Sequence, residues 1–367
     1  MQADEKVKLA RDSFPVLEEW AYLDTGSVGP VSTGYAAALA RCTDEDLRLG
    51  RAWLRRWDRI GAAKERIRSE IAALLGTNPG QIVLTRSTTD GVRTLLRSLN
   101  WSAGDEVVTT RLEFPACANA IAELEQTSQV TVHTAAVPDT NLDALDWLER
   151  CVTPATRLIA FSGVAFTTGA RLPIERIVEF ASARGILTLV DGAQLVGAAT
   201  PDVAATRVDF MALPLQKWLC GPEGLGGLYI REGAAGSRPD EHLVHGWPVL
   251  EAAAEHLRWM RDALGWSWIH ERTLRLAAHA RGVLQDLDPI RLVTPEAHAG
   301  LVAVQCPKDT SRPLYDHLKA EHMIVRYRPE LDLLRISTAF FTTEQEIDRF
   351  AAAIRACDGQ VHSKYAS

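Results

Sequence analysis

Short apolar runs alternate with longer amphipathic segments through the first 230 residues of the chain. The runs have the length of buried strands, and the segments between them carry apolar positions at helical spacing. Strands are expected at 81–85, 106–110, 130–136, 158–162, 187–191, 208–213 and 226–230, and a helical pattern covers 32–75. This alternation predicts an α/β fold with a mostly parallel seven-stranded sheet, whose ligands lie at the carboxyl ends of its strands.

After residue 233 the pattern changes. Helices are expected at 251–287, with a break near Gly265, and at 313–321 and 344–356. Strands are expected at 292–295, 301–306, 324–327 and 333–337. These elements predict a small C-terminal α+β domain. We therefore expect a large α/β domain over residues 21–236, and a small domain that combines residues 1–20 with 237–367.

Composition narrows the class of protein. The 367 residues are 47% hydrophobic and 24% charged, as in an ordinary soluble globular protein. A net charge of −7 argues against nucleic acid and anionic membranes as partners. No apolar run approaches the roughly 20 residues of a membrane span, and the first residues are polar. The six cysteines lack zinc spacing, so we expect reduced thiols, no metal site and a cytoplasmic location.

Two charged residues follow strands that are otherwise apolar. Asp191 ends the run 187–191, and Lys217 comes shortly after the run 208–213. Aspartate and lysine are rarely buried without a partner, so a ligand between them is expected. A pyridine aldehyde cofactor fits, since its ring nitrogen pairs with the acid and its aldehyde forms a Schiff base with the lysine.

The turn at 86–91 is rich in hydroxyl groups and lies between a strand and a helix. It is either a plain helix cap or a phosphate site at a helix N-terminus, and the later acid and lysine favour the phosphate. Phe114 follows the strand 106–110 and either stacks on a planar cofactor or belongs to the core. The Gly-rich stretch 221–227 precedes a strand instead of opening a helix, which excludes a dinucleotide loop or P-loop.

The run Val190-Asp191-Gly192-Ala193-Gln194, followed by Lys217-Trp218-Leu219 and a Gly/Pro-rich turn, carries a family resemblance. Together with the segments from 22–24 to 335–348, it resembles the fold-type I pyridoxal-phosphate enzymes. The likeness is greatest to the class V aminotransferase group, which holds cysteine desulfurases and isopenicillin-N-epimerase-like proteins, and to the latter subgroup in particular. The resemblance implies pyridoxal 5'-phosphate as cofactor, an amino-acid substrate and a homodimer paired through the large domain.

The resemblance also assigns roles to residues. Lys217 would be the catalytic residue that forms the Schiff base and moves the Cα proton. Asp191 would keep the ring nitrogen protonated, and Arg335 would bind the substrate α-carboxylate. The remaining cofactor contacts would be Thr88 and Thr89 at the phosphate, Phe114 on the ring, Gln194 at the ring 3-oxygen, and Gln216. Gly26 and Phe166 would lie beside the substrate together with Arg335.

Several positions depart from the family pattern. Gln216 stands where the family has His, and Pro214 where it has a phosphate-binding Ser, so the phosphate contacts must be partly rebuilt. Phe166 replaces an Asn that contacts the cofactor, and Phe114 replaces a stacking His. A segment after 245–248 is deleted, so the site is either more open or shaped for an unusual substrate.

The residues leave several reactions open. Desulfuration needs a cysteine on the loop before the clamp arginine, and residues 319–334 contain none. Epimerisation needs a second base, for which Tyr327 is one candidate, and transamination stays possible. β-Elimination needs the least machinery, so we expect a carbon–sulfur lyase acting on a modified cysteine or related amino acid in specialised metabolism. An aminotransferase or epimerase is the alternative, and a non-catalytic regulatory module is the alternative of another class.

Overall fold

The computed structural model describes residues 2–137, 145–200, 202–234, 239–241 and 245–365. The helices there are α1 (Ala3–Asp12), α2 (Thr33–Leu49), α3 (Arg56–Leu75), α4 (Thr88–Ser98), α5 (Pro115–Thr127), α6 (Asp146–Glu149), α7 (Ile174–Ser182), α8 (Val203–Thr206), α9 (Trp247–Trp259), α10 (Trp266–Leu284), α11 (Ser311–Ala320) and α12 (Glu344–Tyr365). Shorter turns are η1 (Pro15–Glu18), η2 (Pro79–Gln81), η3 (Met260–Leu264) and η4 (Pro329–Leu331). The strands are β1 (Ala21–Tyr22), β2 (Ile82–Thr85), β3 (Glu106–Thr110), β4 (Thr131–Ala135), β5 (Thr156–Ser162), β6 (Leu187–Asp191), β7 (Phe210–Pro214), β8 (Gly226–Ile230), β9 (Arg291–Leu292), β10 (Leu301–Gln305), β11 (Met323–Ile324), β12 (Arg326–Arg328) and β13 (Leu333–Ser337).

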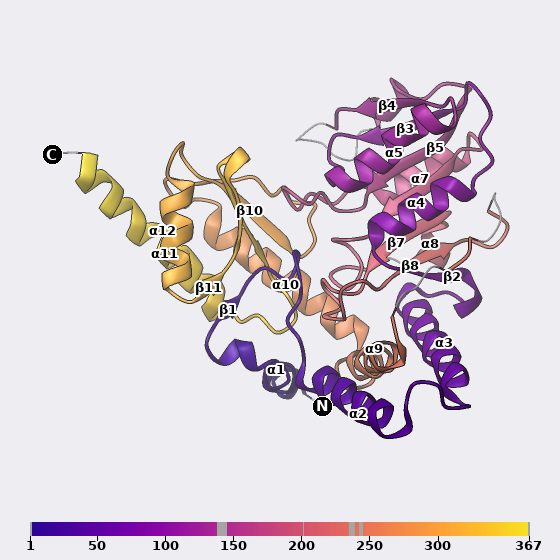
Figure 1. Cartoon of the computed structure of the whole chain (residues 1–367). Helices are drawn as coiled ribbons and strands as arrows, with labels where there is room; N and C mark the ends of the chain where they lie inside the picture. The colour runs from indigo at the N-terminus through magenta and orange to yellow at the C-terminus, as the bar shows by residue number, and fades with distance from the viewer. Residues whose placement is uncertain (1, 138–144, 201, 235–238, 242–244, 366–367) are drawn as a thin grey trace.

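The larger sheet has seven strands in the order β2-β8-β7-β6-β5-β3-β4. β8 runs antiparallel to both of its neighbours, and the other pairs are parallel. Figure 1 shows α4, α5 and α7 around this sheet, with α3 and α9 beneath it. The predicted α/β fold with a mostly parallel seven-stranded sheet is confirmed.

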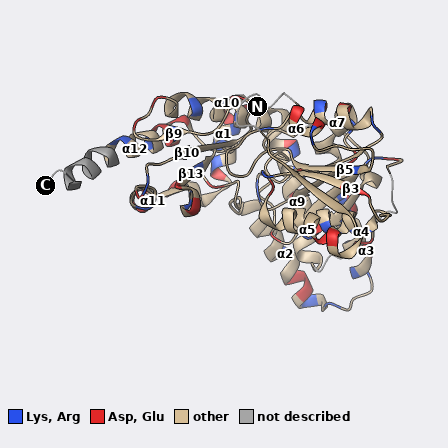
Figure 2. Ribbon diagram, turned by 90° about the horizontal axis from the view of Figure 1, so that it is seen from above, with Lys and Arg blue, Asp and Glu red and all other residues tan. Residues whose placement is uncertain are grey.

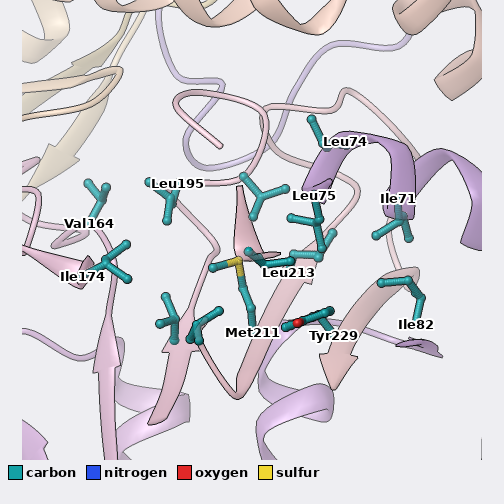
Figure 3. Packing of buried hydrophobic residues seen from close by; sticks show 14 of the residues in the cluster. Ile71, Leu74, Leu75, Ile82, Val164, Ile174, Leu195, Met211, Leu213 and Tyr229 are labelled. Carbon is teal, nitrogen blue, oxygen red and sulfur yellow. The ribbon is translucent and has the colours of Figure 1, made fainter. Parts of the chain in front are cut away.

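Both faces of this sheet are buried, which explains why its strands read as continuous apolar runs. In β7, Phe210 and Ala212 pack into the cluster formed with α4 and α5. Met211 and Leu213 point the other way, into the cluster with α3, α7 and α9 (Figure 3). Because side chains alternate along a strand, residues at the strand ends can be assigned to one face or the other in the same way.

A second, antiparallel sheet lies in the C-terminal part, with the order β12-β13-β10-β9. One face, with Leu334 and Ile336, packs into a cluster with α10, α11 and α12. The N-terminal segment joins this part, because β1 pairs in parallel with β11. Figure 1 shows these elements beside the larger sheet, on the side of α12. The division into domains at residues 21, 236 and 237 stays a prediction.

Several elements differ from the sequence-based expectation. The helical pattern 32–75 is two helices, because Gly50 ends α2 with a φ of +70°. The strand 324–327 is divided, since β11 pairs with β1 whereas β12 pairs with β13. The sequence also indicates helices at 92–99 and 142–151. The first begins four residues earlier, as α4 at Thr88, and the helix expected at 344–356 continues as α12 to Tyr365. Of the range 142–151, residues 142–144 lie outside the described part, and the structure places α6 at Asp146–Glu149.

Charged residues and cysteines are distributed over the described part of the chain as follows. Figure 2 shows basic and acidic residues interspersed along the helices. Within the described residues, every helix is too short or too polar to span a bilayer. The five cysteines whose side chains are described are all free thiols.

Candidate active site

Lys217 lies in a turn just after β7, and distant segments fix that turn. Gly29 N donates to the Gln216 carbonyl oxygen at 2.6 Å. A Cβ at Gly29 would lie 2.4 Å from the Lys217 carbonyl oxygen, so only glycine permits this approach. Buried His256 of α9 donates from Nε2 to the Leu219 carbonyl oxygen at 2.9 Å. Tertiary contacts therefore determine where the lysine points.

Trp218, next to the lysine, anchors the turn on the other side. Its ring is buried in a cluster with Phe14 and Phe340, which come from the two ends of the chain. Gly300 leaves room for this ring, because a Cβ there would lie 2.5 Å from it. Trp218 Nε1 donates to Gln194 Oε1 at 3.0 Å. The turn with Lys217 thus links the larger sheet to the C-terminal part.

Lys217 is buried and electrostatically perturbed. Burial lowers the pKa of its amine to about 8, against the attraction of the Asp191 carboxylate, and Arg335 lowers it further. Among the described residues its Nζ forms no hydrogen bond or ion pair; it lies 5.9 Å from the centroid of the Phe114 ring. An amine with a lowered pKa and no partner is available as a nucleophile near neutral pH.

Asp191 ends β6 and is buried. Its Oδ1 accepts a hydrogen bond from Ala193 N at 2.8 Å. Ser162, at the end of β5, is its partner in the parallel register, and both side chains lie on the face toward α4 and α5. The acid is therefore held at the carboxyl edge of the sheet, as the sequence predicts.

Glu113 is a second buried carboxyl group beside Asp191, which the sequence did not reveal. It accepts hydrogen bonds from Thr110 Oγ1 at 2.6 Å, from Ser162 N at 2.9 Å and from Ser162 Oγ at 2.7 Å. Burial and the nearby Asp191 charge raise its pKa to about 7, although these hydrogen bonds favour the ionised form. An acid directly before Phe114, after a predicted strand, was the signal that could have identified it.

The N-terminus of α4 has the features of an anion site. Ser87 caps the helix by accepting from Asp90 N at 3.1 Å. Thr88 Oγ1 is buried and has no hydrogen-bond partner among the described residues. Thr89 Oγ1 lies 3.5 Å from Cys117 Sγ, at the start of α5. The helix dipole and the unpaired Thr88 hydroxyl suit a phosphate at this position.

Gln194 and Gln216 differ in the hydrogen bonds of their side chains. Gln194 is buried and donates from Nε2 to the Gly26 carbonyl oxygen at 2.8 Å, which leaves its second N–H for another acceptor. Gly26 N in turn donates to Ser337 Oγ at 2.9 Å. Gln216 Oε1 is buried without a donor among the described residues. The structure therefore brings Gln194 and Gly26 together and leaves Gln216 free to accept.

Arg335 lies in β13 and is buried. It donates from Nη1 to the Phe166 carbonyl oxygen and from Nη2 to Ser27 Oγ at 3.2 Å. Asp24 forms a 3.5 Å ion pair with the same nitrogen. Burial lowers the pKa of Arg335 to about 10, and the Asp24 carboxylate opposes the shift. The rings of Phe114 and Phe166 meet edge to face at 5.4 Å between Lys217 and this arginine.

Comparison with known proteins agrees with this geometry. The profile of the aminotransferase class-V family matches residues 48–246. The chain belongs to this family. Isopenicillin N epimerase from Streptomyces clavuligerus is 30% identical, over 92% of this chain and 95% of that protein. A probable cysteine desulfurase from Xylella fastidiosa is 28% identical, over 80% of this chain and 79% of that protein.

Solved structures share the fold of this class-V chain. The cystine C–S lyase C-DES, in complex with its reaction product cysteine persulfide, has a TM-score of 0.86 at 22% identity. That match covers 93% of this chain and 99% of the other. A cysteine desulfurase from Thermococcus onnurineus has a TM-score of 0.82 at 21% identity, over 97% and 98% of the two chains.

Class-V enzymes depend on pyridoxal 5'-phosphate, and this chain is such an enzyme. The residues present fit the cofactor on chemical grounds. Lys217 offers an unpaired amine, Asp191 a buried carboxylate, and Thr88 an unpaired hydroxyl at a helix N-terminus. Phe114 is 42% exposed, so its ring is available to stack. Besides Glu113, sequence reasoning missed Asp24 and Cys117, which join the site only through the fold.

Proposed function

We propose that this class-V enzyme is a carbon–sulfur β-lyase acting on an S-substituted cysteine or a related modified amino acid. The overall reaction converts the substrate and one water into a thiol, pyruvate and ammonia. This proposal is based on the identity of the titratable groups around Lys217. The titratable groups that shift its pKa most are Asp191, Arg335, Cys117 and Asp24, and none of these is a second lysine or a histidine.

The chain's own residues support Cα–H cleavage. Bound cofactor supplies an electron-withdrawing pyridinium ring, which acidifies the Cα proton of an attached amino acid. Asp191 would hold the proton on the ring nitrogen of the bound cofactor, and Arg335 would orient the substrate by its α-carboxylate. Lys217, with a pKa near 8, accepts the Cα proton as a general base. The sulfur then leaves Cβ with the bonding electron pair and takes up a proton as thiol.

The cysteines argue against a desulfurase. Burial raises the pKa of the Cys117 thiol, and the Asp191 and Glu113 charges raise it further. Burial likewise raises the pKa of Cys306 to about 12. A thiol held in its protonated form is a poor nucleophile toward sulfur. Neither of these two cysteines therefore supports a persulfide-accepting role.

An epimerase is the second candidate, since isopenicillin N epimerase is the relative with 30% identity over most of both chains. Epimerisation needs a proton donor on the face of Cα opposite Lys217. Tyr327 lies opposite Leu334, on the core face of the sheet, and stacks on Tyr315 of α11 with ring centroids 5.1 Å apart. Because of this contact, Tyr327 is not supported as the second base of an epimerase. We therefore rank the epimerase below the lyase and equal to the aminotransferase.

The remaining proposals follow from the family. They are the cofactor and substrate contacts of Thr88, Thr89, Phe114, Gln194, Gln216, Gly26 and Phe166, the two-domain division, a homodimer, a cytoplasmic location and a role in specialised metabolism.

The test uses the purified protein loaded with pyridoxal 5'-phosphate. A visible absorption band should form in the parent protein and not in Lys217→Ala. The parent is then incubated with S-methyl-L-cysteine and S-carboxymethyl-L-cysteine, and pyruvate and ammonia are assayed. The same substrates are run with a keto acid as amino acceptor, and in deuterated water with chiral analysis. Pyruvate with equimolar ammonia supports the lyase. Amino transfer, or deuterated inverted substrate, without pyruvate would refute it.

A further inference from the structure

Three arginines lie on one face of the C-terminal sheet. β12 and β13 are antiparallel, with Arg326 directly opposite Arg335. Because alternate residues of a strand share a face, Arg328 lies on the same face as this pair. The other face carries Leu334 and Ile336, which belong to the apolar core. The face away from the core is therefore a basic surface.

Phe166 connects this basic surface to the lysine. Arg335 Nη1 donates to the Phe166 carbonyl oxygen, and Arg328 Cζ lies 4.9 Å from the centroid of the Phe166 ring. The Phe166 ring meets Phe114 at 5.4 Å, and Lys217 Nζ lies 5.9 Å from Phe114. Contacts thus run from Lys217 through the two rings to Arg328.

Two guanidinium groups on this surface each have a buried N–H that makes no hydrogen bond within the described part of the chain. They are Nε of Arg335 and Nε of Arg328. Asp24 and Ser27 accept only from Nη2 of Arg335. Glu330 Oε1 forms an ion pair with Arg328 at 2.9 Å from Nε, without the geometry of a hydrogen bond, and the 56% exposure of the Glu330 side chain makes this a weak, solvent-screened pair. A buried N–H without a hydrogen bond costs free energy, so each arginine favours an additional acceptor.

We propose that Arg328 forms a second anion subsite, and that the substrate is an amino acid whose side chain ends in a negatively charged group. Arg335 receives the α-carboxylate, and the side chain passes the Phe114–Phe166 pair to reach Arg328. This inference rests on the proposed function for the Cα end of the substrate. It adds a substrate class, the acidic side chains, that the lysine and clamp alone do not select.

The experiment compares isosteric ligands that differ only in charge. The protein loaded with pyridoxal 5'-phosphate is titrated with L-aspartate against L-asparagine, and with L-glutamate against L-glutamine. Binding is followed by the change in the visible absorption band. A charge-assisted hydrogen bond should make at least one acid bind about 10-fold tighter than its amide. Arg328→Gln should remove this preference and leave the amide affinity within about twofold of the parent.

Arg326→Gln is the matched control. It removes the same charge from the same face of the same strand, but Arg326 is exposed, so the preference should persist. Arg328→Lys keeps the charge and should restore part of the preference.

Three results would overturn the subsite: equal binding of acids and amides by the parent, a preference that survives Arg328→Gln, or an equal loss in the Arg326 control. Failure of the proposed function looks different. A protein that prefers acidic amino acids but releases no pyruvate from S-carboxymethyl-L-cysteine keeps the subsite and loses the lyase.

Discussion

Glu113 offers a sharp test of the electrostatics, because its carboxyl group is buried beside Asp191 and Cys117. Its pKa is raised from 4.5 to about 7, first by burial and then by the Asp191 charge. A carboxyl group with a raised folded-state pKa stabilises the fold below its unfolded value. That contribution is lost as the pH rises through the folded value. A shift of about 2.5 units corresponds to about 3 kcal/mol.

Glu113→Gln is an isosteric copy of the neutral carboxyl group. Its amide keeps an oxygen for the Thr110 hydroxyl and Ser162 N, and its NH₂ can donate to Ser162 Oγ. The variant should therefore be no less stable than the parent at about pH 5. Relative to the variant, the parent should lose about 2.5 kcal/mol of unfolding free energy between about pH 5 and about pH 8.

The measurement is urea unfolding of the cofactor-free protein at the two pH values, for parent and variant in parallel. Subtracting the unfolding free energy of the variant from that of the parent cancels the contributions of the other titrating groups, which the two proteins share. Glu123→Gln is the control, since it removes an exposed carboxyl group from the neighbouring helix α5 and should leave the pH dependence unchanged. Identical pH slopes for the parent and Glu113→Gln would show that Glu113 is not the buried titrating group.

Three further changes probe the core and the site. Leu213→Ala, in fully buried β7, should lower the unfolding free energy by about 2–5 kcal/mol, and a shift below 1 kcal/mol in urea unfolding would contradict the packing. Asp191→Asn should retain the visible band of bound cofactor but lower kcat by at least about 100-fold, which steady-state kinetics with S-methyl-L-cysteine would measure. His256→Phe leaves the Leu219 carbonyl oxygen unpaired, so it should lower Tm and weaken cofactor binding together; a drop in Tm alone would show that His256 does not position the Lys217 turn.

The sequence determined the larger sheet because its strands are buried on both faces and therefore read as apolar runs with sharp polar ends. The same pattern placed Asp191 and Lys217 at the carboxyl edge, where a charge after an apolar strand stands out. The boundaries of short strands were harder to predict from the sequence. The division of residues 324–327 between β11 and β12 depends on two different partner strands, β1 and β13, that are distant in the chain.

The finer electrostatics of the site depended on tertiary structure alone. The pKa of Glu113 is raised because its carboxyl group is buried beside Asp191. Hydrogen bonds from Thr110 and Ser162, at the ends of two adjacent strands, hold it there. Arg328 matters because antiparallel register puts it on the face of Arg335. No local pattern encodes such pairings, since they arise when strands far apart in sequence come together. Local patterning therefore determined which polar residues end the strands at the carboxyl edge of the sheet, whereas the packing of distant segments decided which charges face one another there.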